Sequence, residues 1–303
     1  MLRDEILESA ILDIAQKIVE IMKEKGLECC IKETTKNGVL YHGIVVVKET
    51  GLAPCLYVES LIDAYDTIEE AKEHIDDFCD NIIQKNDEIK NNPEFESDIM
   101  KLIEDKDWVL NNVYICLQRE NKNEEDTIIK RSCKEDGFDG IEKYLFIEIP
   151  SKQMKCTAKL TRHLLDSIKI TDDEVWKYAE RNTFIEGRTD IGSILDILGD
   201  MTNFTDMQIP INMYYISNNR KNYGSGQILD KNSIKKWVFS LGKKIEKIIC
   251  IPSSIHEWIL IPITKNDCYD INKLNEICQS INDTLVPLKE QLGSYCYVID
   301  DIY

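Results

Sequence analysis

Several sequence patterns that would assign a function directly are missing from this chain. Its four histidines lie far apart, and it contains no CxxC pair and no HxxxH spacing, so the ligand patterns typical of zinc sites are absent. No apolar run approaches the ~20 residues needed to cross a bilayer, and the N-terminal residues have no apolar signal-peptide core. We therefore expect no metal, no cofactor and no membrane anchor.

Nucleotide-binding motifs are incomplete. Gly224-Ser225-Gly226 is half of a dinucleotide fingerprint, but Leu229 stands where the third glycine belongs. Gly242-Lys243 lacks both the upstream glycine and the following Ser or Thr of a phosphate-binding loop. We interpret these glycines as loop residues.

Cysteine is abundant, yet it does not form a disulfide pattern. There are eleven cysteines, an odd number, and they are spread along the whole chain. Many lie among apolar residues, where a free cysteine behaves as a small hydrophobic side chain. The sequence therefore predicts free thiols and a reducing, cytoplasmic location.

Charge is strongly acidic and unevenly placed. The formal net charge of −18 disfavours direct binding to nucleic acid or anionic membranes, because such binding depends on Lys and Arg neutralising phosphates. Residues 1–150 contain 35 acidic and 18 basic residues, whereas residues 151–303 contain 20 and 19. The stretch from Arg220 to Lys247 holds eight basic residues against two acidic ones, and we interpret it as a solvated basic helix face.

Hydrophobic periodicity predicts a mixture of helices and strands. Apolar residues at intervals of three and four indicate an amphipathic helix over 4–25, and Asn37-Gly38 predicts a hairpin turn. Thr67 and Glu70 have the spacing of a capping box that begins a helix. Strands are expected at 28–35, 39–48, 113–117, 144–149, 213–217 and 295–299, and further helices at 95–107, 172–182, 191–198, 233–241 and 271–285.

These elements follow no regular alternation of strand and helix, so an α+β class is favoured over a doubly wound α/β fold. We expect two lobes, each a mixed or antiparallel sheet with packed helices. The turn-rich segment 134–140 and the later Pro150 indicate the boundary. The predicted organisation is an acidic N-terminal lobe at 1–150 and a C-terminal lobe at 151–303.

The strongest local signal is a buried hairpin in the C-terminal lobe, with β-branched runs at 248–251 and 258–261 on either side of the polar insert Pro252–Glu257. Four residues of this insert are candidate contacts to a ligand or partner, namely Ser253, Ser254, His256 and Glu257. They include the residue types of a hydrolytic triad, but a triad needs its members to converge from separate elements. In the structural alternative, the serines bond to their own turn while His256 and Glu257 satisfy buried groups. No catalytic residue is assigned.

Several segments together resemble the domain-of-unknown-function family numbered 5688, a family of uncharacterised clostridial proteins. In chain order they are 36–38, 43–44, 54–59, 179–183, 213–218, 223–224 and 251–257. The Pro-Ser-Ser-Ile-His-Glu segment at 252–257 is the most specific, while the charged stretch 129–139 replaces a proline-containing segment of the relatives. The resemblance implies an architecture over nearly the whole chain, and it implies no reaction, cofactor or catalytic residue.

These observations favour a cytoplasmic, non-enzymatic binding or regulatory protein that acts on a protein partner. One alternative is a hydrolase or metal-dependent enzyme centred on His256. Another is an acidic mimic of nucleic acid whose N-terminal lobe inhibits a basic partner protein. The sequence gives neither the identity of a partner nor the oligomeric state.

Overall fold

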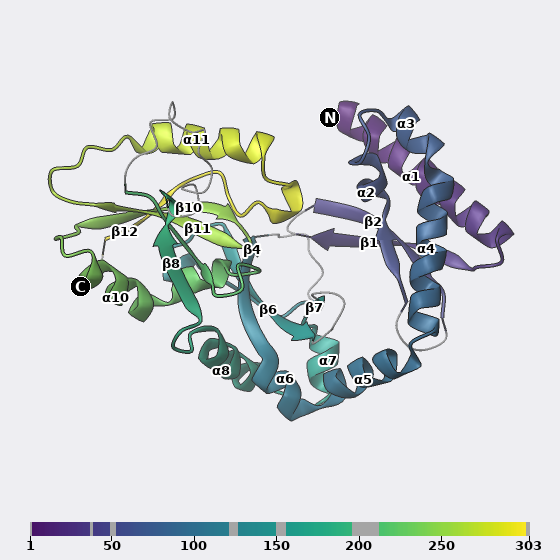
Figure 1. Ribbon diagram of the computed structural model, residues 1–303, viewed down its shortest axis with the longest axis horizontal. Helices are drawn as coiled ribbons and strands as arrows, with labels where there is room; N and C mark the ends of the chain where they lie inside the picture. The colour runs from purple at the N-terminus through teal and green to yellow at the C-terminus, as the bar shows by residue number, and fades with distance from the viewer. Residues whose placement is uncertain are drawn as a thin grey trace. The chain divides into compact units, whose positions relative to one another are not determined.

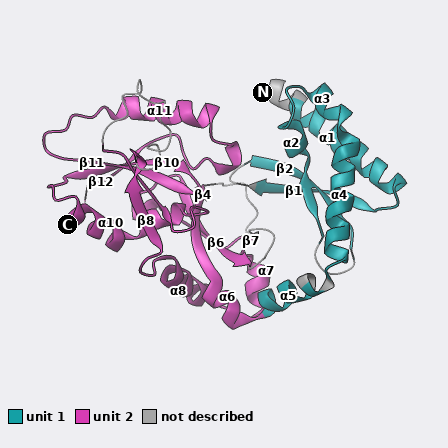
Figure 2. Cartoon of the chain, viewed as in Figure 1, with its two compact units in different colours: residues 1–104 teal, residues 105–303 magenta. Residues whose placement is uncertain are grey.

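The computed structural model describes residues 2–36, 39–48, 53–120, 127–149, 156–195 and 212–300. Helices and antiparallel sheets coexist along the chain without a parallel βαβ unit in these ranges (Figure 1). The predicted α+β class is therefore confirmed. The chain forms two compact units, unit 1 (Met1–Glu104) and unit 2 (Asp105–Tyr303) (Figure 2).

Unit 1 contains a three-stranded antiparallel sheet in the order β1-β2-β3 with helices packed against it. The hairpin register pairs Cys29 with Val46, as the predicted strands require, although its Asn37-Gly38 turn lies outside the described residues. The elements are α1 (Leu2–Glu24), β1 (Cys29–Lys36), β2 (Val39–Val46), β3 (Cys55–Tyr57), α2 (Val58–Ile62), α3 (Ile68–Glu73), α4 (Ile75–Lys90) and α5 (Pro93–Glu104).

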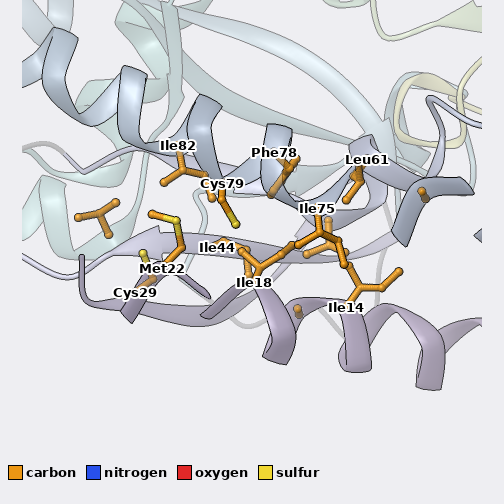
Figure 3. Close-up of a cluster of buried hydrophobic side chains, with 14 residues drawn as sticks. Ile14, Ile18, Met22, Cys29, Ile44, Leu61, Ile75, Phe78, Cys79 and Ile82 are labelled. Carbon is orange, nitrogen blue, oxygen red and sulfur yellow. The ribbon is translucent and has the colours of Figure 1, made fainter. Parts of the chain in front are cut away.

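The core of unit 1 forms where the apolar stripes of α1 and α4 meet the sheet (Figure 3). Ile14 and Ile18 of α1 lie one helical turn apart, so both face inward, and each is at most 1% exposed. Phe78 and Ile82 form the matching stripe of α4. At Thr67 the predicted capping box is confirmed, since its side chain and that of Glu70 each accept a backbone N–H.

The described residues of unit 2 form two antiparallel sheets. One has five strands in the order β12-β10-β11-β9-β8, and the other has the order β4-β6-β5 with β7 also paired to β6. The elements are α6 (Lys106–Asn112), β4 (Val113–Arg119), β5 (Lys130–Ser132), η1 (Lys134–Asp136), β6 (Ile141–Ile149), β7 (Cys156–Lys159), α7 (Arg162–Ser167), α8 (Asp172–Thr183), β8 (Thr189–Ser193), β9 (Tyr214–Asn218), η2 (Ser225–Leu229), α10 (Lys231–Ser240), β10 (Lys247–Ser254), β11 (Glu257–Ile263), α11 (Ile271–Thr284), η3 (Leu288–Glu290) and β12 (Tyr297–Ile299).

Side chains close the free edge of β4. The backbone N–H of Ile115 donates to Thr183 Oγ1 at 2.9 Å, and that of Leu117 donates to Ser225 Oγ at 3.0 Å. An open strand edge otherwise exposes unpaired backbone groups. These two bonds fix α8 and η2 against the edge, and η2 in turn carries the segment that meets the β10–β11 turn.

The helix predicted at 191–198 is wrong at its start, because Thr189–Ser193 is strand β8, paired with β9 from Thr189↔Asn218 to Ser193↔Tyr214. Tertiary pairing outweighs a short amphipathic pattern, and Gly192 lets the Tyr215 ring cover the strand closely. The expected boundary after residue 150 falls inside unit 2, between β6 and β7, which pair with each other.

Among the described residues, no helix is both long and apolar enough to cross a bilayer.

Candidate functional site

The predicted hairpin is present, and its turn is shorter than the polar insert suggested. Strand β10 extends to Ser254 and β11 begins at Glu257, so only Ile255 and His256 lie between them. The register shifts between Ile251 and Ser254, and Pro252 occupies this irregular part of the strand, where proline removes no regular ladder bond. The tip of the hairpin is therefore a two-residue turn within unit 2.

The imidazole of His256 is held by groups from two other segments. Its Nδ1 accepts the backbone N–H of Tyr223 at 3.0 Å, and the two rings lie 5.3 Å apart. Because Nδ1 is an acceptor, the neutral ring carries its proton on Nε2. That Nε2 lies 3.7 Å from a carboxylate oxygen of Glu290. The bond from Tyr223 therefore orients the ring, and the Glu290 carboxylate lies on its other side, beyond hydrogen-bond distance.

The backbone of the turn is bonded as closely as the ring. The carbonyl of His256 accepts Ser217 Oγ at 2.7 Å and the N–H of Gly224 at 3.1 Å. The carbonyl of Ile255 accepts the N–H of Ser225 at 3.2 Å, and the N–H of Ile255 donates to the Glu290 carbonyl at 2.8 Å. The turn therefore joins β9, the 223–225 segment and η3.

Of the four predicted site residues, the structure connects two. Ser254 Oγ accepts the backbone N–H of His256 at 3.1 Å, which is the local turn bond expected of a structural serine. Ser253 and Glu257 are half-buried, and neither side chain hydrogen bonds to the ring of His256. Among the described residues, no serine hydroxyl hydrogen bonds to a ring nitrogen of His256, so the nucleophile–base bond of a triad is not formed by them.

Close packing of the backbone requires glycine at positions 224 and 226. A Cβ at Gly224 would lie 2.5 Å from the N of Asn218 and 2.7 Å from the carbonyl oxygen of His256, and one at Gly226 would lie 2.4 Å from the Ile115 carbonyl oxygen. The backbone itself fills this space, which only glycine permits. The loop interpretation of these glycines thus gains a specific cause, close contact with β4, β9 and the turn.

Sequence reasoning missed the polar groups that surround the hairpin turn. Cys116 is fully buried beside it, with its Sγ 3.3 Å from Ser225 Oγ and 3.5 Å from the Ile255 carbonyl oxygen. Burial raises the pKa of the Cys116 thiol, so this thiol stays protonated and is a poor nucleophile. Tyr223 was marked only by the family resemblance of 223–224 and Glu290 by nothing, because their contacts to the turn form only when distant segments meet.

A second polar cluster lies on the sheet formed by β4, β5, β6 and β7. Buried Gln118 donates to Glu142 Oε1 at 2.6 Å and accepts from Lys159 Nζ at 2.6 Å. Lys130 donates to the same carboxylate oxygen at 3.3 Å. Each buried charge has a partner, as structural networks require. Within the described ranges, no three His, Cys, Asp or Glu side chains gather in a way that could hold a metal ion.

Replacing His256 with alanine is expected to lower the free energy of unfolding by about 2 kcal/mol, because the Tyr223 N–H loses its acceptor and the ring contact is removed. His256→Asn, which restores an acceptor near the Nδ1 position, is expected to recover about half of that loss. Urea unfolding followed by fluorescence measures both. Wild-type stability of the alanine variant would contradict the structural role.

The stability of the protein is expected to depend on the protonation of His256. Burial lowers the pKa of this imidazole below its ordinary value of 6.5, although Glu290 and Glu257 oppose the shift. The unfolded state then binds the proton more readily, so this contribution to stability is present above the unfolded pKa and is lost as the pH falls from 6.5 through the folded pKa. Urea unfolding at several values between about pH 7 and pH 5 should show a steeper loss for wild type than for His256→Asn. Equal slopes would contradict the assignment.

The geometry defines an α+β protein with antiparallel sheets. Its segment 252–257, the most specific part of the family resemblance, ends in a turn whose polar groups hydrogen bond to other parts of unit 2. The model of DUF5688, a family of unknown function, matches residues 9–300. The chain belongs to this family. No curated protein matches the chain. No solved structure matches it either.

Proposed function

We propose that this protein is a cytoplasmic, non-enzymatic binding or regulatory protein that acts on a protein partner. The observation that carries the proposal is that the ring and the backbone of His256 are engaged by other parts of the protein. Both of its ring nitrogens and its carbonyl face protein groups, namely Tyr223, Glu290, Ser217 and Gly224. The segment that looked most like a reactive site is occupied in holding the fold together, which favours a role for surfaces over a role in chemistry.

An enzyme centred on His256 has less support. A general base needs a free ring nitrogen within hydrogen-bond reach of the proton that it takes. Here Nδ1 is engaged by a backbone N–H, and the hydroxyl of Ser254 is engaged by the backbone of the same turn. Rotation of the ring toward a substrate would break the bond to Tyr223.

The acidic-mimic hypothesis has one specific observation in its favour. Residues 1–104, which are unit 1, contain 24 acidic and 11 basic residues, giving a net charge of −13. Exposed carboxylates recur on α4, with Asp76, Asp77, Asp80, Asp87 and Glu88 all on its outer side. Such a surface would attract a basic partner. Affinity capture of partners from native lysate tests this hypothesis.

Affinity capture from native lysate tests the binding proposal. The full chain is immobilised, and captured proteins are identified by mass spectrometry with the His256→Asn variant in parallel. We expect the same partner on both proteins, because the turn supports the fold and does not touch the partner. A partner that binds unit 1 in a salt-dependent manner would favour the mimic hypothesis. Turnover of a copurifying small molecule that is lost in His256→Asn at unchanged stability would overturn the proposal.

A further inference from the structure

The C-terminal end of α10 carries an apolar hollow bordered by lysines. We propose that this hollow binds an acidic segment of a partner protein through one apolar anchor side chain. The hollow measures about 380 Å³ and is lined by Val238, Phe239, Gly242, Lys243 and Lys244. The inference rests on the proposed binding function and names the chemistry of the partner.

The local sequence builds the hollow. Val238 lies on the inner face of α10 and is 1% exposed, whereas Phe239 points outward one position later and is 66% exposed. Gly242 has a φ of +62°, the left-handed conformation with which glycine commonly ends a helix. The chain turns there, and Lys243 and Lys244 border the apolar surface that Val238 and Phe239 form.

The exposed aromatic ring provides the apolar part of the site. A large side chain that is two thirds exposed at the edge of a hollow offers area that a partner can remove from water. Hot spots of protein interfaces are commonly of this kind, an anchor side chain seated in a pocket and surrounded by polar groups. The open hollow beside Phe239 has room for such an anchor.

The lysines provide the polar part. Lys236 and Lys247 on the same stretch are engaged, since each lies 3.3 Å from a carboxylate, on Glu186 and Asp300 respectively. Lys243 and Lys244 are exposed. Lys243 interacts electrostatically with the carboxylate of Asp267, which also accepts hydrogen bonds from the backbone N–H and the hydroxyl of Thr264. Two cations beside an apolar surface complement a segment that carries carboxylates beside an apolar residue.

The charge of the whole chain favours a short acidic protein segment over nucleic acid. Ionic screening limits the reach of exposed charges to about 8 Å at physiological salt, so distant acidic residues repel a short segment at the hollow only weakly. A long polyanion would extend over the remaining surface of a chain with net charge −18 and would be repelled. The lining also contains no arginine and a single aromatic ring, which offers little for base recognition.

Fluorescence anisotropy with the full chain tests the proposal. The probe is a labelled twelve-residue peptide of Asp, Glu and Ser with one central Phe, and the matched probe has Ser in place of the Phe. We expect the Phe probe to bind at least about tenfold more tightly than the Ser probe. Lys243→Glu with Lys244→Glu is expected to weaken Phe-probe binding by at least about tenfold, and Phe239→Ala by about fivefold.

Lys169→Glu with Lys177→Glu is the control, because it makes the same change in net charge at exposed positions elsewhere in unit 2. We expect its affinity to stay within about twofold of wild type, and every variant to keep the wild-type melting temperature. If the glutamate pair unfolds the protein, Lys243→Gln with Lys244→Gln replaces it, with an expected loss of about threefold.

Three results would each overturn the proposal, namely equal affinity of the Lys243/Lys244 variant and wild type, equal affinity for the two probes, or tighter binding of a dT12 oligonucleotide than of the Phe probe. The lysate capture separates this site from the proposed function. Probe binding without any captured partner would count against the function and leave the site standing. A partner captured equally by wild type and the Lys243/Lys244 variant, without probe binding, would overturn the site alone.

Discussion

Replacing Trp258 with alanine is expected to lower the free energy of unfolding by about 4 kcal/mol. The indole is fully buried at the start of β11, directly after the turn, and its ring lies 5.1 Å from that of Phe138 and 5.7 Å from that of Tyr297. These three rings join β11 to β12 and to the loop before β6. The truncation removes the largest side chain among the fully buried residues and leaves a cavity that rigid strands cannot close.

Chemical denaturation with the tryptophan and tyrosine signals read together measures the change. Tyr295→Ala is the matched control, since that ring is 70% exposed and its loss is expected to cost at most about 0.5 kcal/mol. Trp258→Phe is expected to fall between them, because the indole N–H has no hydrogen-bond partner among the described residues. A loss near that of the Tyr295 control would show that the aromatic cluster does not hold unit 2 together.

Replacing Gly224 with alanine is expected to cost about 3 kcal/mol through overpacking. The added Cβ would lie 2.2 Å from Ser217 Oγ, and it would also meet backbone atoms of Asn218 and His256. A side chain can turn away, but a strand and a bonded turn cannot both move without breaking the contacts of the His256 carbonyl.

Gly293→Ala provides the control for this substitution. A Cβ at Gly293 would lie 3.4 Å from the Pro252 ring and 3.9 Å from the Tyr297 hydroxyl, both ordinary contacts, and the backbone there is outside the left-handed region. Its stability is expected to stay within about 1 kcal/mol of wild type. Thermal unfolding of the two variants side by side gives the comparison, and similar melting temperatures would contradict the packing argument.

Local patterns predicted the elements that local chemistry determines. The apolar periodicity of α1 and the capping-box hydrogen bonds between Thr67 and Glu70 each involve residues close in sequence. They can therefore be recognised without knowing the rest of the chain. The β10–β11 hairpin is recognisable for the same reason, because two β-branched runs separated by a short insert need no distant partner to pair. The structural reading of Ser254 also depended on its own turn alone.

The surroundings of the turn could not be predicted in this way. Tyr223 lies 33 positions before His256, and Ser217 lies 39 before it. Their contacts depend on the order of strands β9, β11 and β10 in the sheet, which no short pattern contains. Strand β8 was mistaken for a helix for a related reason, since its pairing with β9 is decided by tertiary structure. Glu290 becomes visible only after η3 returns to the hairpin.

The strand order of the five-stranded sheet has a consequence for biosynthesis. Strand β12 is the last element of the described chain, and it covers the edge of β10 by pairing Val298 with Ile249. Strand β10 is complete at Ser254 and β12 ends at Ile299, and at 5–20 residues per second about 2 to 9 seconds separate the synthesis of these two residues. Throughout that interval the nascent β10 edge, with its run of isoleucines, lacks its final neighbour. The edge of this apolar strand therefore stays unpaired until the last described strand is made, and chaperone demand late in synthesis falls on unit 2.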